Sequence, residues 1–390
     1  MIITFICDVL GEENNGTTIA TMNVIRALKA KGHEVRVVCC DEDKRGLDGY
    51  YIVPAINFGL FNGYVRKNGV RPASKKDEAT IRKALEGADI CHFNFCGFLS
   101  ARSVDIAHEM GIPCTASLHT QAENYTNHVG LMNVSWANDS WYHLLYKWLF
   151  SKVDAIHYPS EFIRDLFEAK NHFKSNGYVI SNGIQKDFHP TLCEKPAGLQ
   201  DKKVLVFTAR YSKEKDHKIL FKALHYSHYE KDIQLILPGA GPDEERFKKW
   251  GAHLSNAPIL GFHSREEMVQ ILNYADLYVH PSLIDIEPLS ALEAMACGLT
   301  PVLSDSKRSS VRYFALDKRN LFRHNSKKDL AQTIDYWLSH PEEKKANRER
   351  YLAYVQQFDF QTSMNRMEEM YLKTIAEWKG KKAETPSDNA

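Results

Sequence analysis

The stretch ADLYVHPSLIDIEPLSALEAMACGLTPVLSD, residues 275–305, predicts a strand, a loop, a helix and a second strand. The apolar run at 277–279 suits a buried parallel strand. Pro288 stands where proline suits the first turn of a helix, and the good helix formers of 289–297 end at Gly298, which suits the C′ position. Such a unit places a helix N-terminus at the carboxyl edge of a parallel sheet, where backbone N–H groups favour a phosphate.

The same alternation of strands and helices extends on both sides of this stretch. At the start of the chain, IITFICDVL, a polar loop, a helix and EVRVVCC predict a right-handed βαβ unit. Residues 185–202, with two prolines and a glycine, predict a linker, after which VLVFTA restarts the alternation. Because 390 residues exceed one ordinary core, we expect an α/β protein with two domains, whose parallel sheets face each other across a cleft.

Composition and charge exclude several classes of protein. The chain is 44% hydrophobic and 25% charged, which is typical of a globular protein, and its 50 basic and 49 acidic side chains cancel, so we expect no nucleic-acid partner. The first loop lacks G-x-G-x-x-G, which argues against a dinucleotide oxidoreductase. No apolar run approaches the roughly 18–20 residues of a membrane span, and Met1 leads into a strand without the basic region of a signal peptide.

The eight cysteines include no C-x-x-C pair, and we expect buried thiols in a reducing compartment. We therefore expect a cytoplasmic protein, lying at most on the inner face of the cell membrane. Residues 50–85 leave two interpretations open, a solvated face or a membrane-surface patch, because aromatic side chains alternate there with basic ones. The basic residues of this segment are Arg66, Lys67, Arg71, Lys75, Lys76, Arg82 and Lys83.

One amphipathic stretch and one acidic stretch favour structural interpretations over functional ones. For the helix expected at 138–150 we favour packing in the core over membrane contact, since its large apolar side chains recur at helical spacing. Asp41 and Asp43 form a D-x-D pattern within a run of charges, and we expect a solvated loop there and no metal site.

Several residues follow predicted strands at positions where ligands bind in open α/β sheets. Arg210 and Lys215 lie in the loop after VLVFTA, where two cations could hold a diphosphate. Gly239 and Gly241, in PGAGP, allow a close approach of backbone to ligand. His119 follows the predicted strand IPCTASL and leads into a polar loop.

Together these features resemble the retaining, family-4-type nucleotide-sugar glycosyltransferases of the GT-B fold, over nearly the whole chain. The residues that carry the resemblance are the R-x4-K pair Arg210 and Lys215, an E-x7-E spacing at Asp285 and Glu293, and EAMACG at 293–298. In this family the Arg and Lys hold the leaving diphosphate, and the second acidic residue binds the ribose hydroxyls. The first acidic residue contacts the donor sugar.

The chain departs from the family pattern at two positions. Asp285 replaces the usual Glu, which leaves open whether Asp285 or Glu287 reaches the sugar, although the register favours Asp285. Pro288 occupies the position of the usual glycine in the donor-binding loop, and proline has no N–H to donate. The resemblance then implies that Leu289 and Ser290 offer their backbone N–H groups to the phosphate.

In the first half, Asn15, Gly16 and Thr17 match the glycine-containing loop of the family. His119 matches a histidine near the 6-hydroxyl of the sugar and the reacting centre. The stretch HTQAENY, with Glu123 and Asn124 as acceptor-side candidates, together with YPSEFIRDLF, looks most like bacterial enzymes that glycosylate diacylglycerol or ceramide.

The resemblance thus implies transfer of a hexose, glucose or galactose, from a nucleoside diphosphate sugar, expected to be a UDP-sugar, to a lipid hydroxyl. We expect an α-glycosidic product with retained configuration, no metal and no cofactor beyond the sugar nucleotide. The alternatives are a glycosyltransferase of envelope or capsular polysaccharide assembly, and an inactive sugar-nucleotide-binding partner subunit. We expect an acceptor domain at 1–188, a nucleotide-sugar domain at 189–362, a helix crossing back at 363–379 and a disordered tail at 380–390.

Overall fold

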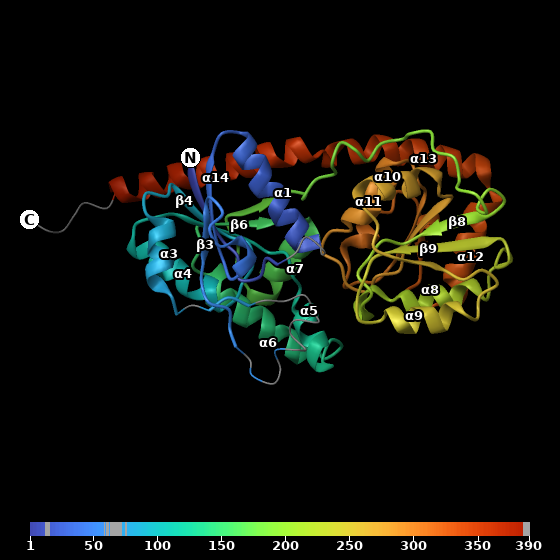
Figure 1. Cartoon of the computed structure of the whole chain (residues 1–390), viewed down its shortest axis with the longest axis horizontal. Coiled ribbons are helices and arrows are strands. Elements are labelled where there is room, and N and C mark those ends of the chain that lie inside the picture. The colour runs from blue at the N-terminus through green and yellow to red at the C-terminus, as the bar shows by residue number, and fades with distance from the viewer. Residues whose placement is uncertain (12–15, 58, 60–61, 63–71, 75, 385–390) are drawn as a thin grey trace, which may run out of the picture. The chain divides into compact units, whose positions relative to one another are not determined.

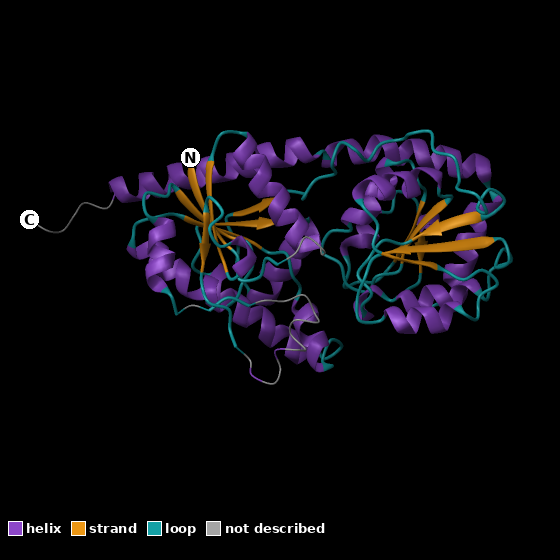
Figure 2. Ribbon diagram, viewed as in Figure 1, coloured by secondary structure: helices purple, strands orange, loops and turns teal. Residues whose placement is uncertain are grey.

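A computed structural model describes the whole chain except residues 12–15, 58, 60–61, 63–71, 75 and 385–390. The chain forms two compact units, each an α/β structure with helices on both faces of a parallel sheet (Figure 2). The first unit comprises Met1–Ser181 and the C-terminal segment from Gln361, and the second unit comprises Asn182–Phe360. The predicted α/β class with two Rossmann-like domains is confirmed.

The first unit is built on a seven-stranded parallel sheet with the order β3-β2-β1-β4-β5-β6-β7. Its strands are β1 (Ile2–Ile6), β2 (Glu34–Cys39), β3 (Tyr50–Ile52), β4 (Ile90–Phe93), β5 (Cys114–Ser117), β6 (Ala155–Tyr158) and β7 (Gly177–Val179). Its helices include α1 (Gly16–Ala30), α3 (Glu78–Leu85), α4 (Phe98–Glu109), α5 (Ala122–Thr126), α6 (Ser135–Leu145) and α7 (Glu161–Asn171).

The last helix of the chain, α14 (Phe360–Glu384), packs on the first unit (Figure 1). Near its start, Glu368 forms an ion pair with Lys31 in the turn after α1, with 2.5 Å between Nζ and Oε2. Near its end, the indole Nε1 of Trp378 donates to the carbonyl of Gly111 at 3.1 Å. The expected return of the C-terminal helix is confirmed, and the helix continues to Glu384, beyond the end expected at Lys379.

The second unit holds a six-stranded parallel sheet with the order β10-β9-β8-β11-β12-β13. Its strands are β8 (Lys203–Val206), β9 (Ile233–Pro238), β10 (Ile259–Gly261), β11 (Leu277–His280), β12 (Pro301–Ser304) and β13 (Leu321–Phe322). Its helices are α8 (His217–Leu224), α9 (Glu244–Gly251), α10 (Arg265–Tyr274), α11 (Leu289–Ala296), α12 (Lys327–Ser339) and α13 (Pro341–Val355).

Two helix boundaries of the second unit follow from local chemistry. A capping box begins α10, since Ser264 N donates to Glu267 Oε2 at 2.7 Å and Glu267 N donates to Ser264 Oγ at 3.2 Å. Gly298 has a φ of 88° directly after α11, the left-handed conformation that ends helices. A side chain at Gly298 would also meet Arg348, because an added Cβ would lie 2.6 Å from its Nε.

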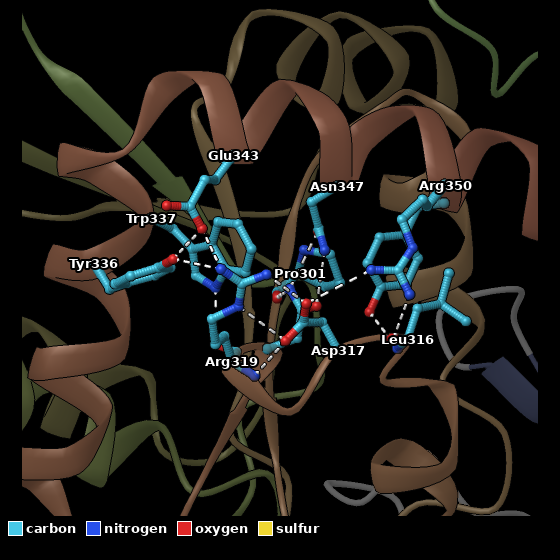
Figure 3. Close-up of polar contacts among 11 residues, drawn as sticks. Pro301, Leu316, Asp317, Arg319, Tyr336, Trp337, Glu343, Asn347 and Arg350 are labelled. Carbon is cyan, nitrogen blue, oxygen red and sulfur yellow. Dashed lines mark hydrogen bonds and ion pairs between the residues drawn. The ribbon is translucent and has the colours of Figure 1, made fainter.

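Helix α13 has no counterpart in the apolar pattern of the sequence, because polar side chains hold much of it in place (Figure 3). The buried Asn347 of α13 exchanges hydrogen bonds with Asn320, at 3.0 and 3.3 Å. Beside this pair, Arg319 makes a two-pronged ion pair with Asp317 and also bonds the hydroxyl of Tyr336 at 2.7 Å. Such contacts leave no apolar stripe to be recognised in the sequence.

The structure corrects one expectation. The side chain of Asp41 does not lie in solvent as expected; it is fully buried and accepts a hydrogen bond from Gly11 N at 2.9 Å, so it ties two loops together. A partner remote in sequence therefore decides where this polar side chain lies.

The expected helix at 138–150 consists of α6 followed by a π-helical turn at Tyr146–Phe150. Of its apolar face, Leu145 is buried, whereas Trp141, Leu144 and Trp148 are only partly buried, and Trp148 packs against the exposed Phe98 with 5.4 Å between ring centroids. In the basic segment at 50–85, Arg66, Lys67, Arg71 and Lys75 lie outside the described residues. Within the described part of the chain, no helix combines the length and the apolar character needed to cross a bilayer.

Candidate functional site

The loops of the second unit meet at the point where its strand order reverses. From β8 the chain builds β9 and β10 on one side, and it then returns to place β11, β12 and β13 on the other side. The loops after β8 and β11 are therefore neighbours at the carboxyl edge, where open α/β sheets bind ligands. The first carries Arg210 and Lys215, and the second carries Asp285 and leads into α11.

Lys215 and Asp285 form the ion pair at the centre of this loop cluster. Lys215 Nζ lies 2.7 Å from Asp285 Oδ2, although the two residues are 70 positions apart in sequence. His280, the last residue of β11, approaches the same oxygen with its Nε2 at 3.0 Å. The backbone of Asp285 is held as well, because Ser310 N donates to its carbonyl at 2.8 Å.

The local charges keep Asp285 ionised. Burial acts to raise the pKa of its carboxyl, but Lys215 and the hydrogen bond from His280 outweigh it and hold the pKa below the ordinary value. Burial lowers the pKa of His280, and the charge of Lys215 acts in the same direction against the opposing pull of Asp285. The cluster is therefore a cationic lysine, an anionic aspartate and a neutral histidine at neutral pH.

Arg210 lies in the same loop as Lys215, and its side chain is partly exposed. Its side chain is 35% exposed, and among the described residues its closest charged partner is Glu214, with 3.8 Å between Nη2 and Oε1. Glu214 is buried and accepts a stronger bond from Ser212 Oγ at 2.6 Å. The donors of Arg210 are thus only weakly engaged and remain available for an anion.

The two glycines of PGAGP have a structural function that the sequence did not reveal. Gly239 lies against Ala209, where an added Cβ would overlap the carbonyl oxygen, and at Gly241 it would lie 2.6 Å from Tyr211 O. The two loops also share backbone hydrogen bonds, including Tyr211 N to Ala240 O at 2.9 Å. These glycines hold the Arg210 loop in place, and their predicted contact with a donor stays a prediction.

The N-terminus of α11 offers one of the two backbone donors that the sequence suggested. Pro288 is its N-cap residue and supplies no side-chain cap. The N–H of Leu289 is already bonded to Glu287 O at 2.9 Å, whereas the N–H of Ser290 has no hydrogen-bond partner among the described residues. Ser290 is thus the better placed of the two for an anion.

The two acidic candidates before α11 have different surroundings. Glu287 accepts two hydrogen bonds from Asn182, from the backbone N at 3.0 Å and from Nδ2 at 2.6 Å. Asp285 instead contacts Lys215 and His280 within the loop cluster. This division favours Asp285 over Glu287 as the residue that faces a ligand.

Glu293 points from α11 with a carboxylate that no hydrogen bond or ion pair from the described residues reaches. Its side chain is half-buried, and burial raises its pKa to about 7, with only a weak opposing effect from Arg265. A carboxylate kept without a partner in such surroundings is a candidate for binding a ligand hydroxyl.

In the first unit, His119 lies two residues beyond the end of β5. It is half-buried, its ring meets His157 at 5.6 Å between centroids, and neither ring nitrogen has a hydrogen-bond partner among the described residues. Burial and the nearby His157 lower its pKa to about 3, so the ring is neutral. A neutral imidazole with both nitrogens unbonded can exchange hydrogen bonds with a ligand.

His92 of β4 and His157 of β6, the strands on either side of β5, have structural partners. Ser117 Oγ bridges them, at 2.9 Å to His92 Nε2 and 2.8 Å to His157 Nδ1, and His157 Nε2 donates to Ile180 O at 2.7 Å. Burial lowers the pKa of both histidines, so this buried row is neutral. Its hydrogen bonds leave no ring nitrogen for a ligand.

The remaining candidates of the first unit are Glu123, Asn124 and the three residues Asn15, Gly16 and Thr17. Glu123 is buried and accepts a hydrogen bond from Tyr142 OH at 2.9 Å, and Asn124 Oδ1 accepts from Gln121 N at 2.9 Å in the capping box of α5. Both therefore have structural partners, which weakens their prediction as acceptor-side residues. Gly16 and Thr17 form the start of α1, and Asn15 lies outside the described residues.

His280 is the residue of the site that sequence reasoning missed. It ends β11 just as His119 follows β5, so the rule that singled out His119, a histidine at the carboxyl end of a parallel strand, applies to it equally. Pro281 follows it directly, which makes the position look like an ordinary strand end.

Comparison with known families assigns each half of the chain. Residues 14–188 match the family described as Glycosyltransferase Family 4, and residues 192–354 match the family described as Glycosyl transferases group 1. The two matches correspond closely to the two structural units.

Similar proteins agree with these matches. The chain is 27% identical to an alpha-monoglucosyldiacylglycerol synthase of Streptococcus pneumoniae over 74% of this chain and 67% of that protein. It is 23% identical to the enzyme of the same name from Acholeplasma laidlawii over 84% of this chain and 86% of that protein. Among solved structures, Anabaena Alr3699/HepE in complex with UDP and glucose is similar in fold, with a TM-score of 0.74, 16% identity, and coverage of 96% of this chain and 100% of that chain.

Proposed function

This chain belongs to the family-4-type glycosyltransferases of the GT-B fold, and we propose that it transfers a hexose from a nucleoside diphosphate sugar to a hydroxyl of a membrane lipid. The donor is a UDP-sugar carrying glucose or galactose, and the anomeric configuration is retained in an α-glycosidic product. No metal takes part. The proposed acceptor is diacylglycerol or a related lipid.

The observation that carries the donor part of this proposal is the loop cluster at the reversal point of the second sheet. Lys215 and the exposed Arg210 supply positive charge at the carboxyl edge, and the unbonded N–H of Ser290 lies at the start of α11. These are three kinds of donor that suit a diphosphate. Glu293, whose carboxylate has no hydrogen-bond partner among the described residues, is the proposed acceptor of hydrogen bonds from the ribose hydroxyls.

The chemistry follows from where charge develops. As the glycosidic bond to the diphosphate breaks, negative charge accumulates on the leaving phosphate, and preorganised cations and N–H groups stabilise it. Because Lys215 also forms an ion pair with Asp285, a bound diphosphate has to share or replace that contact. Asp285 is the proposed contact of the donor sugar, and the acceptor hydroxyl attacks from the same face as the departing diphosphate.

The acceptor part of the proposal is supported by the two similar proteins named alpha-monoglucosyldiacylglycerol synthase, one of which matches along most of its length. His119 is the proposed first-unit residue near the reacting centre, since both of its ring nitrogens lack partners in the described structure. Attachment to the inner face of the cell membrane is part of the same proposal.

A matrix of donors and acceptors tests the proposal. Purified protein is incubated with UDP-glucose, UDP-galactose or GDP-mannose and with detergent-dispersed diacylglycerol, ceramide or a glycan primer, and products are identified by mass spectrometry with NMR of the anomeric linkage. We expect an α-linked hexosyl lipid that forms equally well in the presence of EDTA. A β-linked product, a glycan product, loss of activity with EDTA, or donor binding without any transfer would each overturn the corresponding part.

Arg210→Ala tests the role of the cations. We expect turnover at saturating donor to fall by roughly 10²–10³, the effect of losing one preorganised donor to a developing anion. The matched control is Arg246→Ala, which removes an exposed arginine paired with Asp243 on the same unit and is expected to leave turnover unchanged. Near-normal turnover in Arg210→Ala would contradict the assignment.

A further inference from the structure

We infer that His280 is a positioning residue of the donor site, which orients Asp285 through its Nε2–H so that one carboxylate oxygen stays available for the donor sugar. The inference rests on the proposed function and adds to it a residue for which neither the sequence patterns nor the family matches supply a role. His280 is not among the residues proposed to bind the diphosphate or the acceptor, so its effect on the reaction has to pass through Asp285.

The geometry around Asp285 is asymmetric. Both donors converge on the same oxygen, since Lys215 Nζ lies 2.7 Å and His280 Nε2 lies 3.0 Å from Oδ2. No described residue donates a hydrogen bond to Oδ1. The two contacts therefore fix the rotation of the carboxylate and leave Oδ1 as the acceptor that a sugar hydroxyl can use.

The ring of His280 is itself fixed by its surroundings. It is 1% exposed and packs edge-on against Phe207, with 5.2 Å between ring centroids, and beside Tyr278 at 6.0 Å. Because an ionised carboxylate only accepts hydrogen bonds, the Nε2 of the neutral ring carries the proton. If Lys215 turns toward a bound diphosphate, the buried imidazole remains to hold Asp285 in place.

The other ring nitrogen shows that packing alone does not require a histidine here. Nδ1 is buried and has no hydrogen-bond partner among the described residues. A buried acceptor without a partner lowers stability, so an apolar ring of similar size would suit this pocket at least as well. The hydrogen bond from Nε2 to Asp285 is the contact of this ring that an apolar ring could not make.

The decisive variant is His280→Phe, with His280→Gln as the conservative partner that can still donate from a side-chain nitrogen. His217→Phe is the matched control, because His217 is also buried among aromatic rings, has two unpartnered ring nitrogens and does not contact Asp285. We compare urea unfolding at pH 7.5, calorimetric affinity for UDP and for UDP-glucose, and steady-state kinetics.

We expect His280→Phe to be as stable as the wild type or more stable, to bind UDP within about twofold of it, and to lose roughly tenfold to a hundredfold in kcat/KM, the effect of one charge-assisted hydrogen bond. Affinity for UDP-glucose should fall more than affinity for UDP, and His280→Gln should recover part of the loss. His217→Phe should change neither binding nor turnover. A His280→Phe protein that is destabilised but kinetically normal, or that loses UDP and UDP-glucose affinity equally, would overturn the inference.

The pH profile provides a readout that a purely structural histidine would not move. The charged and titratable groups that face Asp285 are Lys215, from the loop after β8, and Tyr278 and His280 of β11; Ser310, the first residue of η6 (Ser310–Phe314), contacts it through its backbone N–H. Loss of the Nε2–H should raise the pKa of Asp285, so the acid limb of kcat/KM should move to higher pH in His280→Phe. An unchanged acid limb would count against the inference.

An experiment without substrate separates this inference from the proposed function. In ¹⁵N-histidine NMR spectra, wild-type His280 should show the neutral Nε2–H tautomer, and Asp285→Asn should shift its resonances. An Nδ1–H tautomer, or resonances indifferent to Asp285→Asn, would overturn the inference even if the enzyme is active. If the wild type transfers no sugar from any donor, the proposed function fails while the expected tautomer still stands.

Discussion

At the scale of single residues, the candidate site is distinguished by charges that the protein does not satisfy by itself. Glu293 has a half-buried carboxylate without a hydrogen bond from the described residues, and Arg210 has only a 3.8 Å contact to Glu214. Asp317 and Arg319, in contrast, are paired with each other through two hydrogen bonds (Figure 3). Unpaired charge at a sheet edge costs stability, and binding of a ligand would offset that cost.

Glu293→Gln makes this cost measurable. The folded-state pKa of about 7 lies above the ordinary 4.5, so the stability linked to the proton is fully present below pH 4.5 and is lost as the pH rises through 7. At pH 8 we expect Glu293→Gln to raise the free energy of unfolding by about 1–3 kcal/mol, and near pH 4 we expect no difference. Urea titrations at several pH values measure both.

The control for this prediction is Glu349→Gln, which changes an exposed glutamate of α13 and should leave the pH dependence as in the wild type. The same Glu293→Gln protein should bind UDP more weakly, by about 1.5–3 kcal/mol, because a neutral amide replaces a charged acceptor of the ribose hydroxyls. Equal stability at pH 8, together with unchanged UDP affinity, would contradict the role assigned to Glu293.

At the scale of elements, the two units use equivalent helix N-termini differently. In the first unit, Asp8 at the end of β1 fills the N-terminus of α4, where its carboxylate accepts from Leu99 N at 2.8 Å and Ser100 N at 3.0 Å. In the second unit, no side chain caps α11, and the N–H of Ser290 has no partner in the described structure. A carboxylate of the chain thus occupies one anion position, and the other remains available to a phosphate.

Gly97→Ala tests how tightly Asp8 fills its position. Gly97 is the N-cap residue of α4 and has an ordinary extended backbone, but an added Cβ would lie 2.6 Å from Asp8 Cγ. The carboxylate would have to leave the helix N-terminus or the backbone would have to move, so we expect a loss of about 1–3 kcal/mol in unfolding free energy.

Gly380→Ala is the matched control for that variant. Gly380 lies in α14 with nothing within 4 Å of an added Cβ, so the substitution should be neutral or slightly stabilising through helix propensity. If Gly97→Ala melts like Gly380→Ala, the fit of Asp8 against α4 is looser than the structure implies.

At the scale of the whole molecule, α14 completes the core of the first unit although its sequence follows that of the second. Met364, Met367, Met370 and Tyr371 of this helix are buried, and the ring of Tyr371 meets that of His92 in β4 at 5.4 Å. The core of the first unit therefore includes residues that follow the second unit in the sequence, as the expected return of this helix implied.

Substitutions of Tyr371 distinguish packing from hydrogen bonding in this contact. The ring is fully buried, and its hydroxyl has no hydrogen-bond partner among the described residues. We expect Tyr371→Ala to lower the free energy of unfolding by about 3–5 kcal/mol, the usual effect of removing a buried aromatic ring. Tyr371→Phe should be neutral or stabilising, and calorimetric melting of the two proteins measures both effects.

A large loss in Tyr371→Phe would reveal a hydrogen bond to the hydroxyl in solution. A small loss in Tyr371→Ala would mean that α14 contributes little to the first unit, contrary to its burial in the structure.

Local patterns were sufficient for the parts of the fold whose causes lie within a few residues. The strand and helix of 275–305, the capping box of Ser264 and Glu267, and the helix end at Gly298 are all set by neighbouring side chains, and all are present. Helix α13 and the short strand β3 escaped prediction because polar contacts to remote residues, and an edge position in the sheet, hold them in place.

Which side chains come together at the site depends on strand order, and no short window of sequence contains that order. Lys215 and Asp285 meet across 70 residues because β8 and β11 are neighbours in the sheet. The same packing brings Glu287 into hydrogen-bonding contact with Asn182 and places His280 against Asp285. It leaves the carboxylate of Glu293 without a hydrogen bond or ion pair from the described residues. Residue types and spacing thus defined the candidates, and the long-range arrangement of the strands selected among them, because hydrogen bonds and ion pairs act over a few ångströms in space and not along the chain.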